Sequence, residues 1–147
     1  MPHVTFLSDR FSNTPTPDSI NDMLGKDVAE WLRAGLVAAG FDAGEVIAED
    51  YGYGFWLERS RSHYWITSAQ YEPPEGAAPP KWLVGIDYDP GCLWIWRLRA
   101  RPQPGDQVAI ARAVHNLLQA EAAIRQIEWW SDSRQRNAPT PEPPETP

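Results

Sequence analysis

The sequence predicts an α+β fold, an antiparallel meander sheet of about five to six strands with two helices packed on one face. Two observations lead to this prediction. Short runs of strand-forming residues, separated by short turns, fill the centre of the chain, and an amphipathic helical pattern lies on each side of them. Short connections make consecutive strands antiparallel neighbours. With 147 residues there is room for a single core, so we expect one domain over residues 1–132.

The first two predicted elements are a strand and a helix. Residues 3–7 alternate apolar and polar side chains, whereas residues 8–21 have the Ser, Asn, Pro and Asp content of a loop. Residues 22–39 place apolar side chains near helical spacing, and Gly40 stands where a helix commonly ends in a left-handed residue. Gly35, inside this pattern, indicates close packing against a neighbour.

Five strands are expected next, over residues 45–48, 54–59, 63–70, 82–88 and 93–99. Four prolines in residues 72–80 predict a surface loop, because proline lacks the amide hydrogen that a ladder needs. The last two strands are expected to form a hairpin around Asp89-Pro90-Gly91. Within it, Asp87 is interpreted as part of the hairpin corner rather than as a calcium ligand.

The C-terminal part predicts a second helix and then a tail. An apolar stripe runs through residues 107–130, and Asp106 is a candidate N-cap for one helix over this range. Residues 138–147 contain five prolines and two glutamates, so we expect residues 133–147 to be a Pro-rich disordered tail. Such a tail should be dispensable for folding.

Charge and composition exclude several classes of function. The net charge is −7, and residues 1–50 alone carry −6, which argues against nucleic acid as a partner. Arg97, Arg99 and Arg101 are interpreted as a solvated strand edge. There is no long apolar run for a membrane helix and no secretion signal, and the single cysteine, Cys92, gives no support for an oxidising compartment. We therefore expect a cytoplasmic protein that does not bind a membrane.

No residue pattern predicts a catalytic centre. The three histidines, His3, His63 and His115, show no paired zinc spacing, and His63 and His115 are each expected to be partly buried structural residues rather than catalysts. Cys92 has no local sign of activation, and the glycines match no phosphate loop or dinucleotide fingerprint. We expect no metal, no cofactor and no catalytic residue, although the sequence leaves an enzymatic activity open.

The most informative feature is the arrangement of tryptophans. Residues 49–98 hold five of the eight tryptophans, and several predicted strands are apolar on both faces. If Phe55, Leu57, Tyr64, Ile66 and Ile95 face the core, then Trp56, Trp65, Trp94 and Trp96 lie on the opposite face. Two helices cover only one face of a sheet, so at least two of these four rings should be exposed and bind a partner.

A second candidate site is the string from Glu49 to Tyr53. Its adjacent carboxylates, Glu49 and Asp50, precede a Gly-aromatic-Gly turn, and with Tyr51, Tyr53 and His63 they form a possible ligand-binding set. A purely structural bend is the alternative, because glycines permit unusual backbone angles over which the tyrosines pack.

This string and the helix-then-meander order around it resemble a group of small bacterial α+β proteins without an assigned activity. In that group an acidic pair leads into an aromatic-Gly-aromatic strand start, often with Trp where this chain has Tyr51 and Tyr53. The resemblance covers residues 3–130. It implies an α+β sandwich and supplies no activity or catalytic residues.

We therefore expect a small acidic protein-binding module that docks through an aromatic sheet face. By analogy with other small acidic bacterial proteins, it resembles an immunity or inhibitor protein. Two alternatives remain open. One is a small-ligand binder or enzyme with a pocket near Glu49 and Tyr53. The other is a homodimer in which two aromatic faces bury each other.

Overall fold

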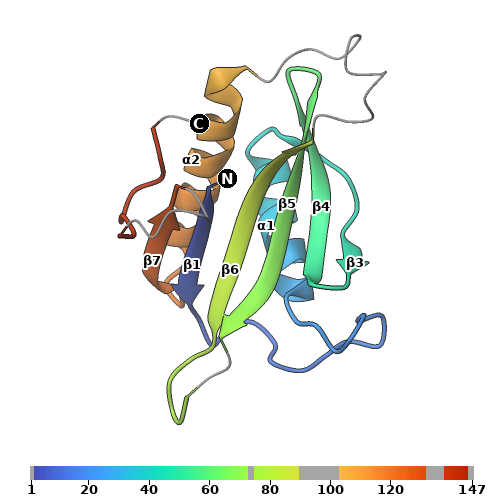
Figure 1. Cartoon of the computed structure of the whole chain (residues 1–147), viewed down its shortest axis with the longest axis vertical. Coiled ribbons are helices and arrows are strands. Elements are labelled where there is room, and N and C mark those ends of the chain that lie inside the picture. The colour runs from blue at the N-terminus through green and yellow to red at the C-terminus, as the bar shows by residue number, and fades with distance from the viewer. Residues whose placement is uncertain (1, 73–74, 90–102, 132–137, 146–147) are drawn as a thin grey trace.

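The computed structural model describes residues 2–72, 75–89, 103–131 and 138–145 (Figure 1). Within these ranges the chain forms two helices and one antiparallel sheet of seven strands. The helices are α1 (Lys26–Ala38) and α2 (Pro104–Ala120). The strands are β1 (His3–Leu7), β2 (Asp42–Ala43), β3 (Ile47–Glu49), β4 (Gly52–Arg59), β5 (Ser62–Glu72), β6 (Lys81–Asp89) and β7 (Arg125–Trp130). The strand order is β2-β4-β5-β6-β1-β7, and β3 also pairs with β4.

The mixed fold and the antiparallel sheet are confirmed, but the sheet is larger than the five to six strands expected. Strands β4, β5 and β6 form the predicted central meander. The connection between β4 and β5 is a two-residue turn, in which Ser60 and Arg61 have φ angles of 51° and 63°. Positive φ at both central residues matches the right-handed twist of the strands on either side.

The additional strand β7 corrects the prediction of one helix over residues 107–130. Helix α2 ends at Ala120, and Glu121 has an extended backbone with φ −91° and ψ 111°. From Arg125 onward the chain pairs with β1, placing Trp129 opposite Val4. The apolar residues of this segment fit a strand as well as a helix. The strand is favoured because pairing with β1 satisfies the backbone hydrogen-bonding groups along the otherwise free edge of β1.

The start of α2 also differs from the expected cap. Gln103 occupies the N-cap position and Pro104 follows it, as is common in the first helical turn. Asp106 lies inside that turn, where Arg59 Nε and Ser60 Oγ each donate to its Oδ1 at 3.1 Å. Asp106 therefore ties α2 to the turn between β4 and β5 instead of capping the helix.

Gly35, inside α1, and Gly40, just beyond its end, have the roles that the sequence indicated. Gly40 has φ +90°, and the amides of Gly40 and Phe41 donate to the carbonyls of Val37 and Leu36. This is the bonding pattern of a helix that ends in a left-handed residue. A Cβ at Gly35 would lie 2.7 Å from Leu117 Cδ2 of α2, so the two helices touch where α1 has no side chain.

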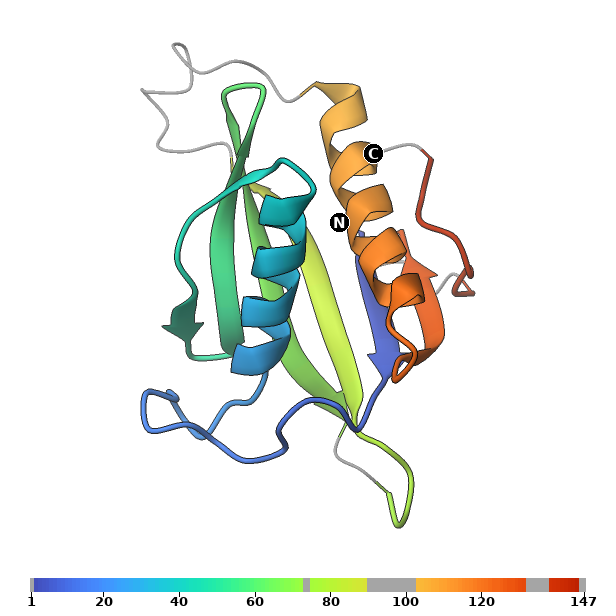
Figure 2. The same cartoon turned by 180° about the vertical axis from the view of Figure 1, so that it is seen from behind.

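The core lies between the helices and the sheet. Figure 2 shows α1 and α2 in front of the sheet, and Figure 1 shows the same helices behind it. Leu32 and Leu118 are fully buried, as predicted. The buried strand residues of the same cluster include Phe55, Leu57, Tyr64, Ile66, Trp82, Val84 and Ile86. Neither helix in the described part of the chain is long and apolar enough to span a membrane.

Two further predictions concern segments near the ends of the sheet. The expected strand over residues 93–99, with Ile95, lies outside the described residues. One edge of β6 pairs with β5, and the opposite edge pairs with β1 over Lys81–Gly85. In the C-terminal segment, Thr140 exchanges two backbone hydrogen bonds with Trp129, at 2.8 and 2.9 Å. The domain boundary near residue 132 stays a prediction, but part of the segment beyond it contacts the sheet.

Candidate functional site

The face of the sheet opposite the helices, called here the open face, carries the candidate site. Register places Trp56 of β4 opposite Trp65 of β5, and Trp65 opposite Asp87 of β6. The neighbouring residues Phe55, Leu57 and Ile66 point to the other side, where they are buried in the core. Alternation along the strands thus brings two indoles and one carboxylate side by side on the open face.

Trp65 lies flat on the sheet because its neighbour on β4 is a glycine. A Cβ on Gly54 would come within 2.7 Å of Trp65 Cε2, so the indole occupies the space that any other side chain would need. Trp65 Nε1 donates a hydrogen bond to Tyr51 Oη at 3.0 Å. Only 9% of Trp65 is exposed, so it is not one of the exposed rings, at least two, that were expected among the four tryptophans.

Trp56 packs on Trp65 and remains accessible. Their ring centroids are 4.7 Å apart at an interplanar angle of 51°, a distance typical of interacting aromatic pairs. The ring centroids of His63 and Trp56 are 6.5 Å apart. Trp56 keeps 39% of its surface exposed, and the expected second exposed ring would be Trp94 or Trp96, which lie outside the described residues. The buried indole therefore supports the exposed one.

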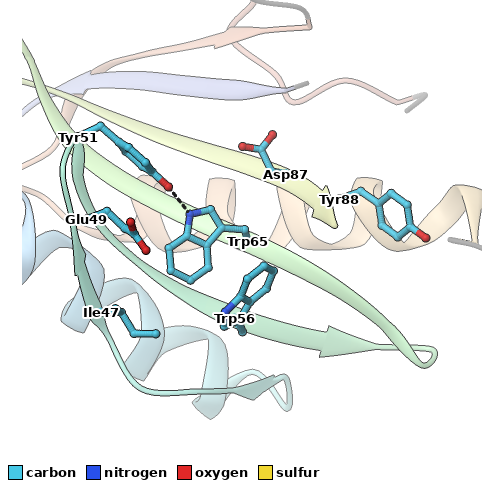
Figure 3. A pocket seen from close by; sticks show the side chains of 7 residues that line it. All are labelled: Ile47, Glu49, Tyr51, Trp56, Trp65, Asp87 and Tyr88. Carbon is cyan, nitrogen blue, oxygen red and sulfur yellow. Dashed lines mark hydrogen bonds between the residues drawn. The ribbon is translucent and has the colours of Figure 1, made fainter. Parts of the chain in front are cut away.

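A groove of about 310 Å³ lies along these rings, and we call it the indole groove (Figure 3). Its lining comes from β3, the turn between β3 and β4, and strands β4, β5 and β6. The residues are Ile47, Glu49, Tyr51, Trp56, Trp65, Asp87 and Tyr88. Figure 3 shows the Glu49 and Asp87 carboxylates on opposite sides of the Trp65 ring. The groove is thus aromatic in the middle and acidic at both sides.

Asp87 is the electrostatically unusual residue of the groove. Its Oδ1 is buried and has no hydrogen-bond partner among residues 2–72, 75–89, 103–131 and 138–145. Burial raises the pKa of this carboxyl above its ordinary value, because removal from water disfavours the charged form. An unpartnered buried carboxylate oxygen costs stability, and such groups in native proteins call for an explanation beyond packing.

The predicted ligand-binding set is only partly brought together. Glu49 and Tyr51 line the indole groove, and His63 lies beside Trp56. Asp50 is exposed at the tip of the β3–β4 hairpin and does not line the groove. Tyr53 points to the helix side, where it is buried and its hydroxyl lies 2.7 Å from Thr16 Oγ1.

The bend that contains these residues has a structural basis. Gly52 has φ +152°, and a Cβ there would lie 3.0 Å from the Cβ of Ala69. The alternative that the sequence offered, a bend with tyrosines packed around glycines, is therefore also present. The bend positions Tyr51 over the open face, where it accepts the hydrogen bond from Trp65.

Several predicted residues lie outside the described part of the chain, namely Trp94, Trp96, Cys92, Arg97, Arg99 and Arg101. Three groove residues, Ile47, Asp87 and Tyr88, are not among the site residues that the sequence predicts. The sequence places Asp87 at a hairpin corner because Pro90 and Gly91 follow it. Strand alternation indicates its side of the sheet. Val84 and Ile86 of β6 face the core, so Asp87, next to Ile86, faces away from it.

The other histidines have structural surroundings. His115 is buried, its Nδ1 accepts a hydrogen bond from Trp129 Nε1 at 3.1 Å, and its Nε2 lies 3.5 Å from Glu142. His3 stacks on Trp130 with ring centroids 6.0 Å apart. Over the residues that the structure describes, no three His, Cys, Asp or Glu side chains gather closely enough to hold a metal ion.

Comparisons with protein-family models, with curated proteins and with solved structures find no match to this chain.

Proposed function

We propose that this protein is a binding module that docks another protein through the indole groove. The observation that carries the proposal is the exposed Trp56 ring, held in place by a buried Trp65. Tryptophan and tyrosine dominate protein interfaces because they bury a large area while losing little rotamer freedom. A fixed ring has even less freedom to lose on binding.

The surroundings of Trp56 support the proposal. Ile47 and Tyr51 are 45% and 48% exposed and border the same groove. Isolated exposed apolar residues are ordinary, but adjacent ones that line one groove are typical of interaction sites. Both described helices lie on the other side of the sheet (Figure 2), so neither shields this surface.

The exposure of the lining favours a protein over a small molecule as the occupant. Pockets for small ligands bury most of the ligand and are largely enclosed. Here Ile47, Tyr51 and Trp56 keep about two-fifths or more of their surface in solvent. A partner side chain that enters the groove, with its backbone passing over these residues, would cover them.

Site-specific photo-crosslinking tests the proposal. A benzophenone amino acid replaces Ile47, at the rim of the groove, and the full chain is irradiated in the cells that produce it. We expect one crosslinked heterologous protein, and we expect Trp56→Ala in the same chain to abolish that product. The matched control carries the benzophenone at Val37, an exposed residue of α1, and should not give the product.

Other outcomes would overturn the proposal. A crosslink only to a second copy of the chain would support the homodimer. A product that forms equally with Trp56→Ala would show that the groove is not the contact surface. The absence of any Ile47-specific product, together with a bound metabolite in the purified protein, would favour the small-ligand alternative.

A further inference from the structure

We propose that the indole groove accepts a cationic side chain, arginine or lysine, from the docked protein. This inference rests on the proposed docking function and adds the chemistry of the group that enters the groove. Three features of the groove support it: an unpartnered carboxylate, a second carboxylate across the rings, and an aromatic floor.

The first feature is Asp87. No residue that the structure describes forms a hydrogen bond with its buried Oδ1, although Trp65, directly opposite in the register, has its own polar atom satisfied by Tyr51. A positively charged N–H donor entering the groove would supply the missing partner. Hydrogen bonds between charged groups are roughly twice as strong as neutral ones, so this position favours a cation over a neutral amide.

The second feature is Glu49, on the far side of Trp65 from Asp87 (Figure 3). Glu49 is half-buried, and no described residue forms an ion pair with it. Its carboxylate gives the groove two negative groups that come from β3 and β6, with the rings of β4 and β5 between them. A cation over the rings would be attracted from both sides.

The third feature is the pair of indoles. A guanidinium or ammonium group is attracted to the face of an aromatic ring, and tryptophan gives the strongest interaction. Trp56 and Trp65 meet at 51°, so their faces form a corner rather than a flat surface. The aliphatic part of arginine or lysine can pack in that corner beside Ile47 while the charged end reaches Asp87 or Glu49.

The charge of the chain agrees with a cationic partner. The net charge is −7, and residues 1–50, which include β3, carry −6. Charges of this sign speed the encounter with a basic surface and slow that with an acidic one. A basic segment would therefore be drawn toward the groove before its side chain enters it.

The test uses the full chain labelled with ¹⁵N at tryptophan and four short capped peptides, Gly-Xaa-Gly with arginine, lysine, citrulline or norleucine at Xaa. Indole signals of Trp56 and Trp65 are assigned from Trp→Phe variants. We expect the arginine or lysine peptide to shift these two signals with a dissociation constant on the order of 1 mM. Citrulline, which has nearly the shape of arginine but no charge, should bind at least about tenfold more weakly.

Three variants locate the effect. Asp87→Asn should weaken the binding of the arginine or lysine peptide by at least about fivefold, because a charged acceptor is lost. Trp56→Leu keeps an apolar side chain but should also weaken the binding of this peptide, because the ring face is lost. Glu30→Gln on the exposed side of α1 removes the same charge far from the open face and should leave the affinity unchanged.

The failure of this inference can be told apart from the failure of the docking function. If norleucine shifts the two indoles as strongly as arginine, or Asp87→Asn has no effect, the cation preference is wrong. If no peptide shifts them while the Ile47 crosslink still captures a protein, the docking surface stands and its occupant is not a cationic side chain.

Discussion

Replacing Gly54 with alanine should displace Trp65, the ring on which the exposed Trp56 packs. A Cβ at this position would lie 2.7 Å from Trp65 Cε2 and 2.8 Å from the carbonyl oxygen of Ile66. The carbonyl belongs to the β4–β5 ladder and cannot move freely, so the indole has to tilt away from the sheet. Overpacking of this kind costs about 1–3 kcal/mol.

The displaced ring also loses its hydrogen bond to Tyr51, which adds about 1 kcal/mol. We therefore expect Gly54→Ala to lower the free energy of unfolding by about 2–4 kcal/mol. Trp65 should in addition become accessible to a fluorescence quencher. Urea unfolding followed by circular dichroism measures the first effect. The second is measured by acrylamide quenching with and without Trp65→Phe in the same background, so that the difference reports Trp65 among the eight tryptophans.

Gly44 provides the matched control. A Cβ there would lie 3.6 Å from its nearest neighbour, the carbonyl oxygen of Trp56, which is an ordinary contact distance. Gly44→Ala should therefore be neutral or slightly stabilising, by up to about 1 kcal/mol. If Gly54→Ala costs no more than Gly44→Ala, the idea that a glycine allows Trp65 to lie flat is wrong.

Three further predictions concern the core, the groove and the C-terminal segment. Leu32→Ala or Leu118→Ala should each lower the free energy of unfolding by about 2–5 kcal/mol, because both side chains are fully buried; a loss below 0.5 kcal/mol at both sites in urea unfolding would contradict this. Asp87→Asn should be more stable than the wild type at pH 7. The burial that raises the pKa of Asp87 favours the protonated form, so its contribution to stability is present below the ordinary value of 3.8 and is lost as the pH rises through the higher folded value. The advantage of the variant should therefore shrink as the pH falls toward 4, and an equal difference at both pH values would refute the assignment. The sequence alone predicts that truncation after residue 136 leaves stability unchanged. Because Thr140 pairs with Trp129, the structure instead predicts a loss of about 1 kcal/mol, and an unchanged thermal midpoint would show that this pairing contributes nothing.

The central part of the fold follows from local sequence patterns. The apolar residues of α1 recur near helical spacing, and Gly40 ends the helix as its position indicated. The meander of β4, β5 and β6 follows from alternating residues joined by short turns. In these segments the local preference and the final environment agree, which is the condition under which sequence reasoning succeeds.

The C-terminal part could not be predicted in the same way. The choice between helix and strand for residues 125–130 depends on the open edge of β1, more than 100 residues earlier in the chain. Ile124 and Ile127 fit helical spacing whereas Ile127 and Trp129 fit strand alternation, so the local pattern supports both structures. Asp106 illustrates the same limit, because its partners Arg59 and Ser60 come from a distant turn.

The candidate site was half predictable. Strand parity correctly separated the exposed Trp56 from the buried Phe55 and Leu57. Parity could not show that Trp65 would lie over Gly54, because that depends on cross-strand register. The register also brings Asp87 to Trp65, and it turned a presumed corner residue into the acidic side of the groove.

The affinity of the crosslinked partner for the Trp56→Ala variant tests the docking surface most directly. The partner identified from the Ile47 position is purified, and its dissociation constant is measured by calorimetry for the wild type, for Trp56→Ala and for the control Val37→Ala. We predict that Trp56→Ala weakens binding by about 2 kcal/mol or more, roughly thirtyfold, while Val37→Ala has no effect. Circular dichroism should show that both variants remain folded. A folded Trp56→Ala variant that binds within about threefold of the wild type would contradict the proposal that the indole groove is the docking surface.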